Sequence, residues 1–252
     1  MSILRHMLSR GWILATVLVL AGAAVCVRLG IWQLDRLDQR SAFNDQVTSM
    51  RALSPLDLNA DQSADVATME YRAVIVSGAY DFENQIALRN QYYDGRYGYH
   101  LVTPLLLADG RAILVDRGWI PSEGNDSPAG WTRYATAEQI EVRGVMRLGA
   151  ENPRFGGVPD PTLTPNQSRL DIWNFANIER IGAQMPYPLL PVYIQLDVDS
   201  NDTEPPIPYQ PIIELTEGPH FGYALQWFSF AAILLIGYPF FIRKQTTELT
   251  AQ

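Results

Sequence analysis

A histidine and two aromatic residues share one face of the last apolar helix that the sequence predicts. His220, Tyr223 and Trp227 stand at positions i, i+3 and i+7, and Gln226 is the adjacent polar residue. A neutral imidazole is a common axial ligand of haem iron, and aromatic rings can pack against the macrocycle. Aromatic side chains also gather at the headgroup level of a membrane as plain anchors. The spacing alone leaves both interpretations open.

A second constellation follows the first apolar segment. Arg28, Trp32 and Arg36 are spaced by four residues, so they line one face of a helix. Trp and Arg are standard anchors at the membrane interface. The same cationic, aromatic rim could instead hold a planar ligand that carries carboxylates.

A third constellation, Asp116-Arg117-Gly118-Trp119, ends a predicted strand. These residues could form part of a binding edge. They could also form a turn beside a packed indole, and on the local pattern alone packing is the favoured interpretation of Arg117 and Trp119.

The sequence lacks the usual catalytic signatures. It contains no phosphate-binding glycine loop, no H-E-x-x-H and no G-x-S-x-G. His100 is the one histidine between the apolar segments, and a cross-strand or surface role is expected for it. Cys26 is the only cysteine and lies within an apolar segment, so the central domain has no disulfide and no thiolate metal site.

Two apolar segments frame the chain and must position these residues. We expect the first transmembrane helix over 11–31 and the second over 220–242, each long enough for a hydrocarbon core of about 30 Å. Ala21-Gly22-Ala23 also fits a signal-peptide cleavage site, but the helical pattern continues beyond it, which favours retention.

Charges next to these segments predict the topology. Arg243 and Lys244 close the second segment, so residues 1–10 and 243–252 are expected in the cytoplasm and the domain over 32–219 on the outer face. No Arg-rich, Ser-rich import signal precedes the first segment, which favours a bacterial plasma membrane. From Arg28 to Pro219 the chain carries fifteen basic and twenty-six acidic residues, a formal net charge of −11, which argues against nucleic acid as a partner.

The central domain reads as mainly β. A charged helix is expected over 34–50, and strands over 71–80, 84–90, 97–107, 111–120, 139–147 and 192–198. A helix of about four turns is expected over 171–185, with long loops over 121–130 and 152–168. Asp-Gly turns between short strands are typical of hairpins. The predicted fold class is an α+β membrane protein, with two transmembrane helices flanking an antiparallel sheet or small β-barrel that carries one or two helices.

Four matched motifs, in this order between two apolar segments, resemble the surfeit-locus (Surf/Shy) family of cytochrome c oxidase assembly factors. They are Leu29-Gly30-x-Trp32-Gln33-Leu34-x-Arg36, Thr103-Pro104-Leu105, Val115-x-Arg117-Gly118-Trp119-Ile120-Pro121 and His220-x-Gly222-Tyr223-Ala224-x-Gln226-Trp227-Phe228. The family often has Asn where this chain has Asp116.

The resemblance implies a non-enzymatic factor for maturation of haem-copper oxidases. It implies the oxidase catalytic subunit as a partner, haem A synthase as a further candidate, and membrane lipid around the helices. It also implies transient binding of haem a through His220. The hypothesis is that Tyr223 and Trp227 pack on the macrocycle and that Arg28, Arg36 or Arg117 pairs with the propionates.

Two other classes of function stay open. The first is a membrane-tethered scaffold that stabilises oxidase subunits without binding haem. The second is an outer-face enzyme that uses His100.

Overall fold

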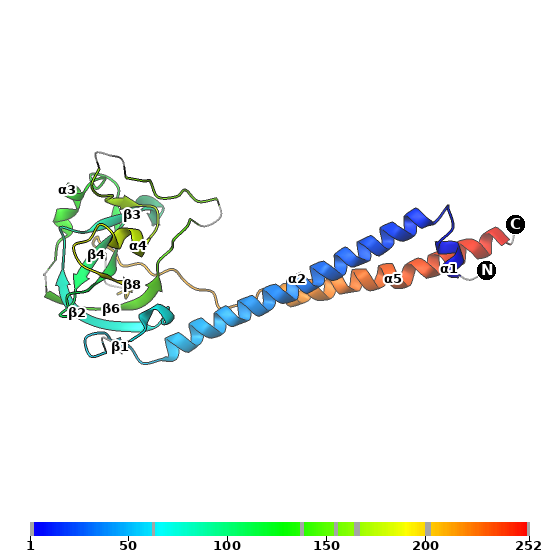
Figure 1. Ribbon diagram of the computed structural model, residues 1–252, viewed down its shortest axis with the longest axis horizontal. Coiled ribbons are helices and arrows are strands. Elements are labelled where there is room, and N and C mark those ends of the chain that lie inside the picture. The colour runs from blue at the N-terminus through cyan, green and yellow to red at the C-terminus, as the bar shows by residue number, and fades with distance from the viewer. Residues whose placement is uncertain are drawn as a thin grey trace. The chain divides into compact units, whose positions relative to one another are not determined.

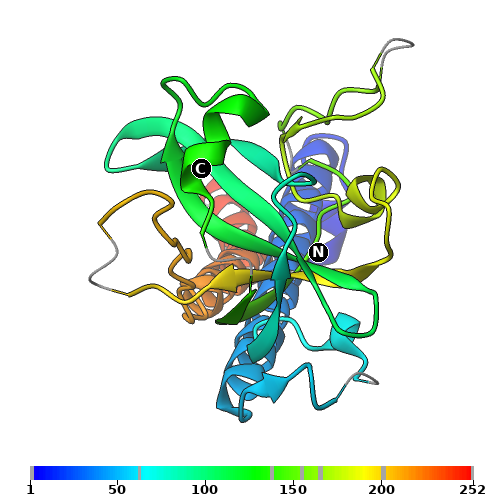
Figure 2. The same ribbon diagram turned by 90° about the vertical axis from the view of Figure 1, so that its left-hand side faces the viewer.

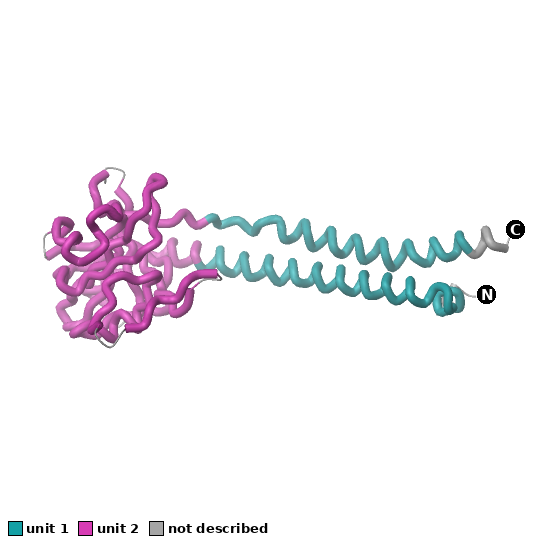
Figure 3. The backbone as a smooth tube through the Cα atoms, turned by 90° about the horizontal axis from the view of Figure 1, so that it is seen from above, with its two compact units in different colours: residues 1–46, 214–252 teal, residues 47–213 magenta. Residues whose placement is uncertain are grey.

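The computed structural model describes residues 3–61, 64–136, 139–153, 156–163, 167–199 and 203–250, and side chains from 5 to 245 within those ranges. The chain divides into two compact units (Figure 3). Unit 1 comprises 1–46 and 214–252, and unit 2 comprises 47–213. Parts of the predicted loop over 152–168, and the extreme residues of the two expected cytoplasmic ends, lie outside the described residues.

Unit 1 consists of helices. They are α1 (Ile3–Met7), α2 (Ile13–Ala52, which continues into unit 2) and α5 (His220–Thr250) (Figure 1). The predicted apolar helix and the predicted charged helix over 34–50 form the single continuous helix α2, which at 1.5 Å per residue is about 60 Å long. Both α2 and α5 are long and apolar enough to cross a membrane, and few side chains of their apolar windows are buried.

Helices α2 and α5 pack antiparallel within unit 1. The Thr16 and Tyr238 hydroxyls lie 2.7 Å apart, and a Cβ added at Gly30 would lie 2.7 Å from the Phe228 ring. The glycine therefore lets the aromatic ring approach the α2 backbone. Ala224 is 1% exposed on the facing side of α5, so small residues line the contact on both helices.

Unit 2 is built on one mixed sheet that closes into a barrel (Figure 2). The sheet order is β1-β2-β6-β8-β5-β4-β3-β7, and an additional β2–β4 pairing through Ala79–Leu106 and Tyr80–Leu105 closes five of these strands. The strands are β1 (Leu56–Asp57), β2 (Ala73–Tyr80), β3 (Ile86–Tyr93), β4 (Arg96–Leu106), β5 (Ala112–Pro121), β6 (Gln139–Leu148), β7 (Ile172–Trp173) and β8 (Leu189–Leu196). The predicted small barrel is thus confirmed.

The barrel has the strand order of an OB-fold. Its five strands in chain order are β2, β4, β5, β6 and β8. The first pairs with the second and the fourth, and the third runs parallel to the fifth. This is a closed five-stranded Greek-key barrel. The short helices of unit 2 are η1 (Val66–Thr68), α3 (Pro128–Trp131), η2 (Thr132–Tyr134) and α4 (Ile178–Gly182).

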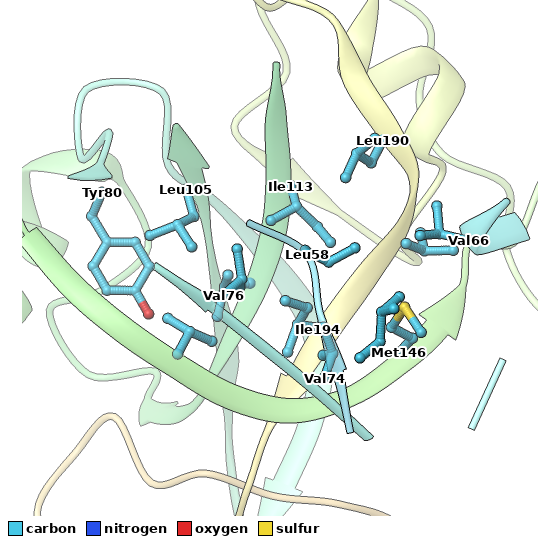
Figure 4. Close-up of a cluster of buried hydrophobic side chains, with 14 residues drawn as sticks. Leu58, Val66, Val74, Val76, Tyr80, Leu105, Ile113, Met146, Leu190 and Ile194 are labelled. Atoms are coloured by element: carbon cyan, nitrogen blue, oxygen red, sulfur yellow. The ribbon is translucent and has the colours of Figure 1, made fainter. Parts of the chain in front are cut away.

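Alternating apolar residues of the five barrel strands form one core cluster (Figure 4). Val76, Leu105, Ile113, Met146 and Ile194 are each 0% exposed. Successive strand residues point to opposite faces, so one inward set fills the barrel and the opposite set is left for the outer face.

Two predictions about this unit were wrong. The helix expected over 171–185 is replaced by the short strand β7, which pairs with β3, and by the five-residue α4. The Asn177 side chain accepts from the Arg180 N–H and so starts α4 only at Ile178. The sheet is also not purely antiparallel, because β5 and β8 run parallel where the chain crosses over through 122–188.

Candidate functional site

His220 begins α5 and is held by a hydrogen bond to α2. It is partly buried, and its Nδ1 lies 2.8 Å from Oε1 of Gln33. Because an amide oxygen only accepts, Nδ1 carries the proton and the lone pair of the neutral ring lies on Nε2. A histidine that binds a metal through one ring nitrogen usually donates the N–H of its other ring nitrogen to an acceptor. Gln33 was part of a matched motif but was not among the predicted site residues.

The other predicted residues of this helix face are accessible. Tyr223 is 47% exposed, and its N–H bonds to the Pro219 carbonyl at 3.1 Å, within the first turn of α5. Trp227 is partly buried and meets Phe230 edge-on at 5.9 Å. Gln226 is exposed. Tyr223 and Trp227 therefore share the helix face of His220. Gln33 is the hydrogen-bond partner of the imidazole among the described residues.

The three residues of the predicted cationic rim are exposed on α2. Arg28 and Trp32 are solvent-accessible, and the Arg36 guanidinium lies over the Trp32 ring at 5.6 Å. Arg36 also donates to Gln39 at 2.8 Å. These contacts suit a stacked anchor, and Arg28 and Trp32 remain available to a ligand.

Arg40, which was not among the predicted site residues, donates hydrogen bonds to the segment that precedes α5. Its Nε donates to the Thr216 carbonyl at 2.9 Å, and Nη2 donates to the Glu214 carbonyl. Arg40 continues the four-residue spacing that singled out Arg28 and Arg36, so the signal was present in the sequence. Arg40 therefore connects the segment that leads into His220 to the C-terminal half of α2.

Arg117 and Trp119 lie in unit 2 and are 4% and 2% exposed. Arg117 donates to Gln85 at 3.2 Å and lies over the Tyr80 and Phe82 rings at 5.3 and 5.2 Å. Burial lowers the pKa of Arg117, and its cation is held by ring faces and acceptors inside the protein. This environment favours the packing interpretation of Arg117 over a role with propionates.

A bulge at Arg117 shapes the end of β5. Asp116 and Gly118 face the consecutive residues Val102 and Leu101 of β4, so Arg117 is an extra residue in the ladder. Gly118 has φ +111°, and a Cβ there would lie 2.1 Å from the Ile207 carbonyl oxygen. Only glycine fits this position, because the backbone is left-handed and the approach is close.

The bulge brings two titratable side chains together on the outer face of the barrel. His100 and Asp116 are 5% and 4% exposed, and His100 Nδ1 lies 2.9 Å from Asp116 Oδ2. Burial lowers the pKa of His100, but the attraction and hydrogen bond of Asp116 outweigh it, so the pKa is raised above 6.5. The expected cross-strand or surface role for His100 missed this pair. The departure from the family's usual Asn at 116 was the available signal, since an Asp there supplies the charge that His100 needs.

This pair borders a cavity of about 500 Å³ in unit 2. Segments that follow β6 and β7 line the cavity together with the outer sides of β3, β4, β5 and β8. Among the described residues, no group of three His, Cys, Asp or Glu side chains could hold a metal ion.

The arrangement defines a class of protein with a closed five-stranded barrel between two apolar helices and a histidine at the start of the second. A family model described as the SURF1 family matches residues 20–232. The SURF1-like protein of Rickettsia felis is 26% identical over 232 residues, which cover 90% of this chain and 96% of that protein. Surfeit locus protein 1 of Takifugu rubripes is 25% identical over 237 residues, with 86% and 92% covered. The SURF1-like protein of Monosiga brevicollis is 27% identical over 240 residues, with 90% and 87% covered.

The chain belongs to the SURF1 family. The resemblance drawn from the four motifs is thereby confirmed.

Proposed function

We propose that this protein is an assembly factor for haem-copper cytochrome c oxidase and that it hands haem a, as cargo, to the catalytic subunit. Membership of the SURF1 family supports the assembly role. The single observation that supports the haem role is the 2.8 Å contact between Gln33 and His220, which fixes the ring tautomer and leaves Nε2 free to ligate iron.

The described residues around His220 fit such a cargo. Tyr223 is half exposed, and Trp227 presents an indole on the same helix face, so both offer ring surface to a planar macrocycle. Arg28 and Arg36 are exposed cations on α2 that suit carboxylates. One protein ligand on the iron binds weakly enough for release, which a carrier requires.

The proposal places both helices across a bacterial plasma membrane, with both termini in the cytoplasm and unit 2 on the outer face. The length and apolar surface of α2 and α5 support the crossing, and Arg243 with Lys244 after the second apolar segment supports the orientation. On the outer face, His220 would meet the catalytic subunit, and haem A synthase as a further partner, at the membrane surface.

Deletion of the gene in a host that makes an aa3-type oxidase tests the assembly role. We expect the haem a band in the reduced-minus-oxidised spectrum of the membranes to fall and to return with the wild-type copy. An unchanged band would contradict the assembly role. A band restored fully by a His220→Ala copy would favour the scaffold over the haem carrier.

A further inference from the structure

The cavity beside His100 lies where OB-fold barrels bind their ligands. These barrels use the outer face of their second and third strands, together with the loop between strands one and two and the loop between strands four and five. Here the second and third barrel strands are β4 and β5, which carry His100 and Asp116. Leu88 and Gln91 come from β3, which lies in the connection between the first and second barrel strands, and Phe175 comes from the connection between the fourth and fifth. The haem proposal concerns unit 1 and uses none of these residues.

At the His100 end of this cavity, the acceptors of Asp116 and Gln195 are already engaged. Asp116 Oδ2 pairs with His100 Nδ1 at 2.9 Å, and Oδ1 accepts the Gly118 N–H at 3.0 Å. The Gln195 side-chain oxygen accepts from Arg147 at 3.1 Å. Both carboxylate oxygens of Asp116 and the carbonyl of Gln195 therefore have donors within the protein.

The donors are not all engaged. Within the described residues, His100 Nε2, the Gln195 amide nitrogen and the Tyr193 hydroxyl have no hydrogen-bond partner, and all three residues line the cavity. His100 Nε2 is a donor in the imidazolium form, which the 2.9 Å contact with Asp116 favours. Burial and the nearby Asp116 raise the pKa of Tyr193 to about 12, so its hydroxyl stays protonated at neutral pH. Arg147 adds a guanidinium that bonds to Glu70 and Gln195 through Nε and Nη1. This end of the cavity, where donors are free and the acceptors of Asp116 and Gln195 are engaged, favours a ligand group rich in acceptors.

The rest of the lining is mixed. It includes the polar residues Asn90, Gln91, Asn152 and Asn174 and an apolar set. Leu88, Phe175 and Ala176 stand along one side, and Leu88 and Ala176 belong to the buried cluster that continues beneath α4. A volume of about 500 Å³ suits a small organic molecule and is too small for a folded partner. The acidic balance of the chain between the apolar helices opposes a nucleic acid, the ligand of many OB-folds.

We propose that this cavity binds a small amphipathic organic carboxylate, with the carboxylate at His100, Tyr193, Gln195 and Arg147 and the apolar body along Leu88 and Phe175. The acid supplies the acceptor atoms that the free donors lack. His100, fixed by Asp116, presents Nε2 as the central contact.

The test uses the full-length chain in detergent micelles, with 2-naphthoate as the probe and 2-naphthamide as its neutral twin. Calorimetric titration, corrected with protein-free micelles, measures both affinities. We expect the acid to bind at least tenfold more tightly than the amide. His100→Gln should weaken the acid at least tenfold, and Tyr193→Phe should weaken it several-fold while keeping the buried ring.

Tyr92→Phe is the matched control, because Tyr92 is 64% exposed and lies outside the cavity lining. It should leave the affinity for the acid unchanged, and so should His220→Ala, which separates this proposal from the haem proposal. Equal binding of acid and amide, wild-type affinity in both cavity variants, or no binding of either probe would each overturn the proposal.

Discussion

At the scale of single residues, two histidines are each fixed at Nδ1 by a neighbour, but by neighbours of different charge. Gln33 holds His220 with a neutral acceptor, whereas Asp116 holds His100 with a carboxylate. The neutral partner leaves a ring that suits iron, and the charged partner favours an imidazolium. The sequence pointed to His220 through helix spacing. It did not reveal the His100 pair, because sixteen residues separate the two side chains and a bulge aligns them.

The His100–Asp116 pair predicts a pH dependence. The folded pKa of His100 is raised above its usual 6.5, so the pair contributes stability fully below about pH 6.5 and loses it as the pH rises through the folded pKa. Asp116→Asn should lower the pKa of His100 and should lower the melting temperature more at pH 6 than at pH 9. NMR titration of labelled histidines, assigned with His100→Gln, measures the shift. A folded pKa below 6.5 in the wild type would contradict this reading of the pair.

Substitution of Gln33 should reduce haem retention, although Gln33 itself is not proposed to contact the haem. Gln33→Leu removes the acceptor that orients His220, and loss of such a partner typically weakens a metal site about 10- to 100-fold. Protein purified from cells that make haem A should therefore carry much less haem. Gln39→Leu, on the same helix, is the matched control and should retain the haem. Equal haem content in Gln33→Leu and Gln39→Leu would rule out the positioning role.

At the scale of elements, strands could be predicted better than the crossover. The expected strands match β2, β4, β5, β6 and β8 closely because each alternates between the barrel core and the outer face. The helix expected over 171–185 failed because Ile172 and Trp173 pair with β3 instead, a tertiary contact that local pattern does not contain. The parallel β5–β8 pairing likewise depends on a connection that no turn signal marks.

The bulge after Asp116 predicts a sharp glycine requirement. Gly118→Ala combines a left-handed backbone with a contact of 2.1 Å to the Ile207 carbonyl, so it should destabilise unit 2 by well over the roughly 1–2 kcal/mol of the backbone alone. Gly124→Ala is the matched control, since φ there is +72° and nothing lies within 4 Å of the added Cβ. Thermal melting followed by tryptophan circular dichroism compares the two. Similar melting temperatures would mean that the close approach does not matter.

At the scale of the whole molecule, α5 and most of α2 belong to one compact unit, and the barrel belongs to another. The sequence predicts a domain over 32–219 between two apolar segments, whereas the unit that holds the barrel spans 47–213. The sequence did not predict that α2 runs unbroken for forty residues, because charged residues after Trp32 suggested a separate helix. An unbroken helix satisfies its own backbone hydrogen bonds both in lipid and in water, so no break is needed at the boundary.

The expected membrane topology predicts at which positions a fused reporter enzyme is active. Alkaline phosphatase fused after residue 213 should be active, because unit 2 is expected outside the cytoplasm, and the same enzyme fused after Gln252 should be inactive. A cytoplasmic fluorescent reporter should give the reverse pattern. Activity of phosphatase at both positions would mean that α5 does not cross the membrane.

The central claim is that His220 ligates the iron of haem a. The most direct measurement is the haem content, by pyridine haemochrome, of full-length wild-type and His220→Ala protein purified from the same cells that make haem A. His6→Ala, which changes another histidine of unit 1, serves as the control. We expect the wild type and His6→Ala to carry haem a and His220→Ala to lose nearly all of it. Equal haem content in all three proteins would show that His220 does not ligate the iron.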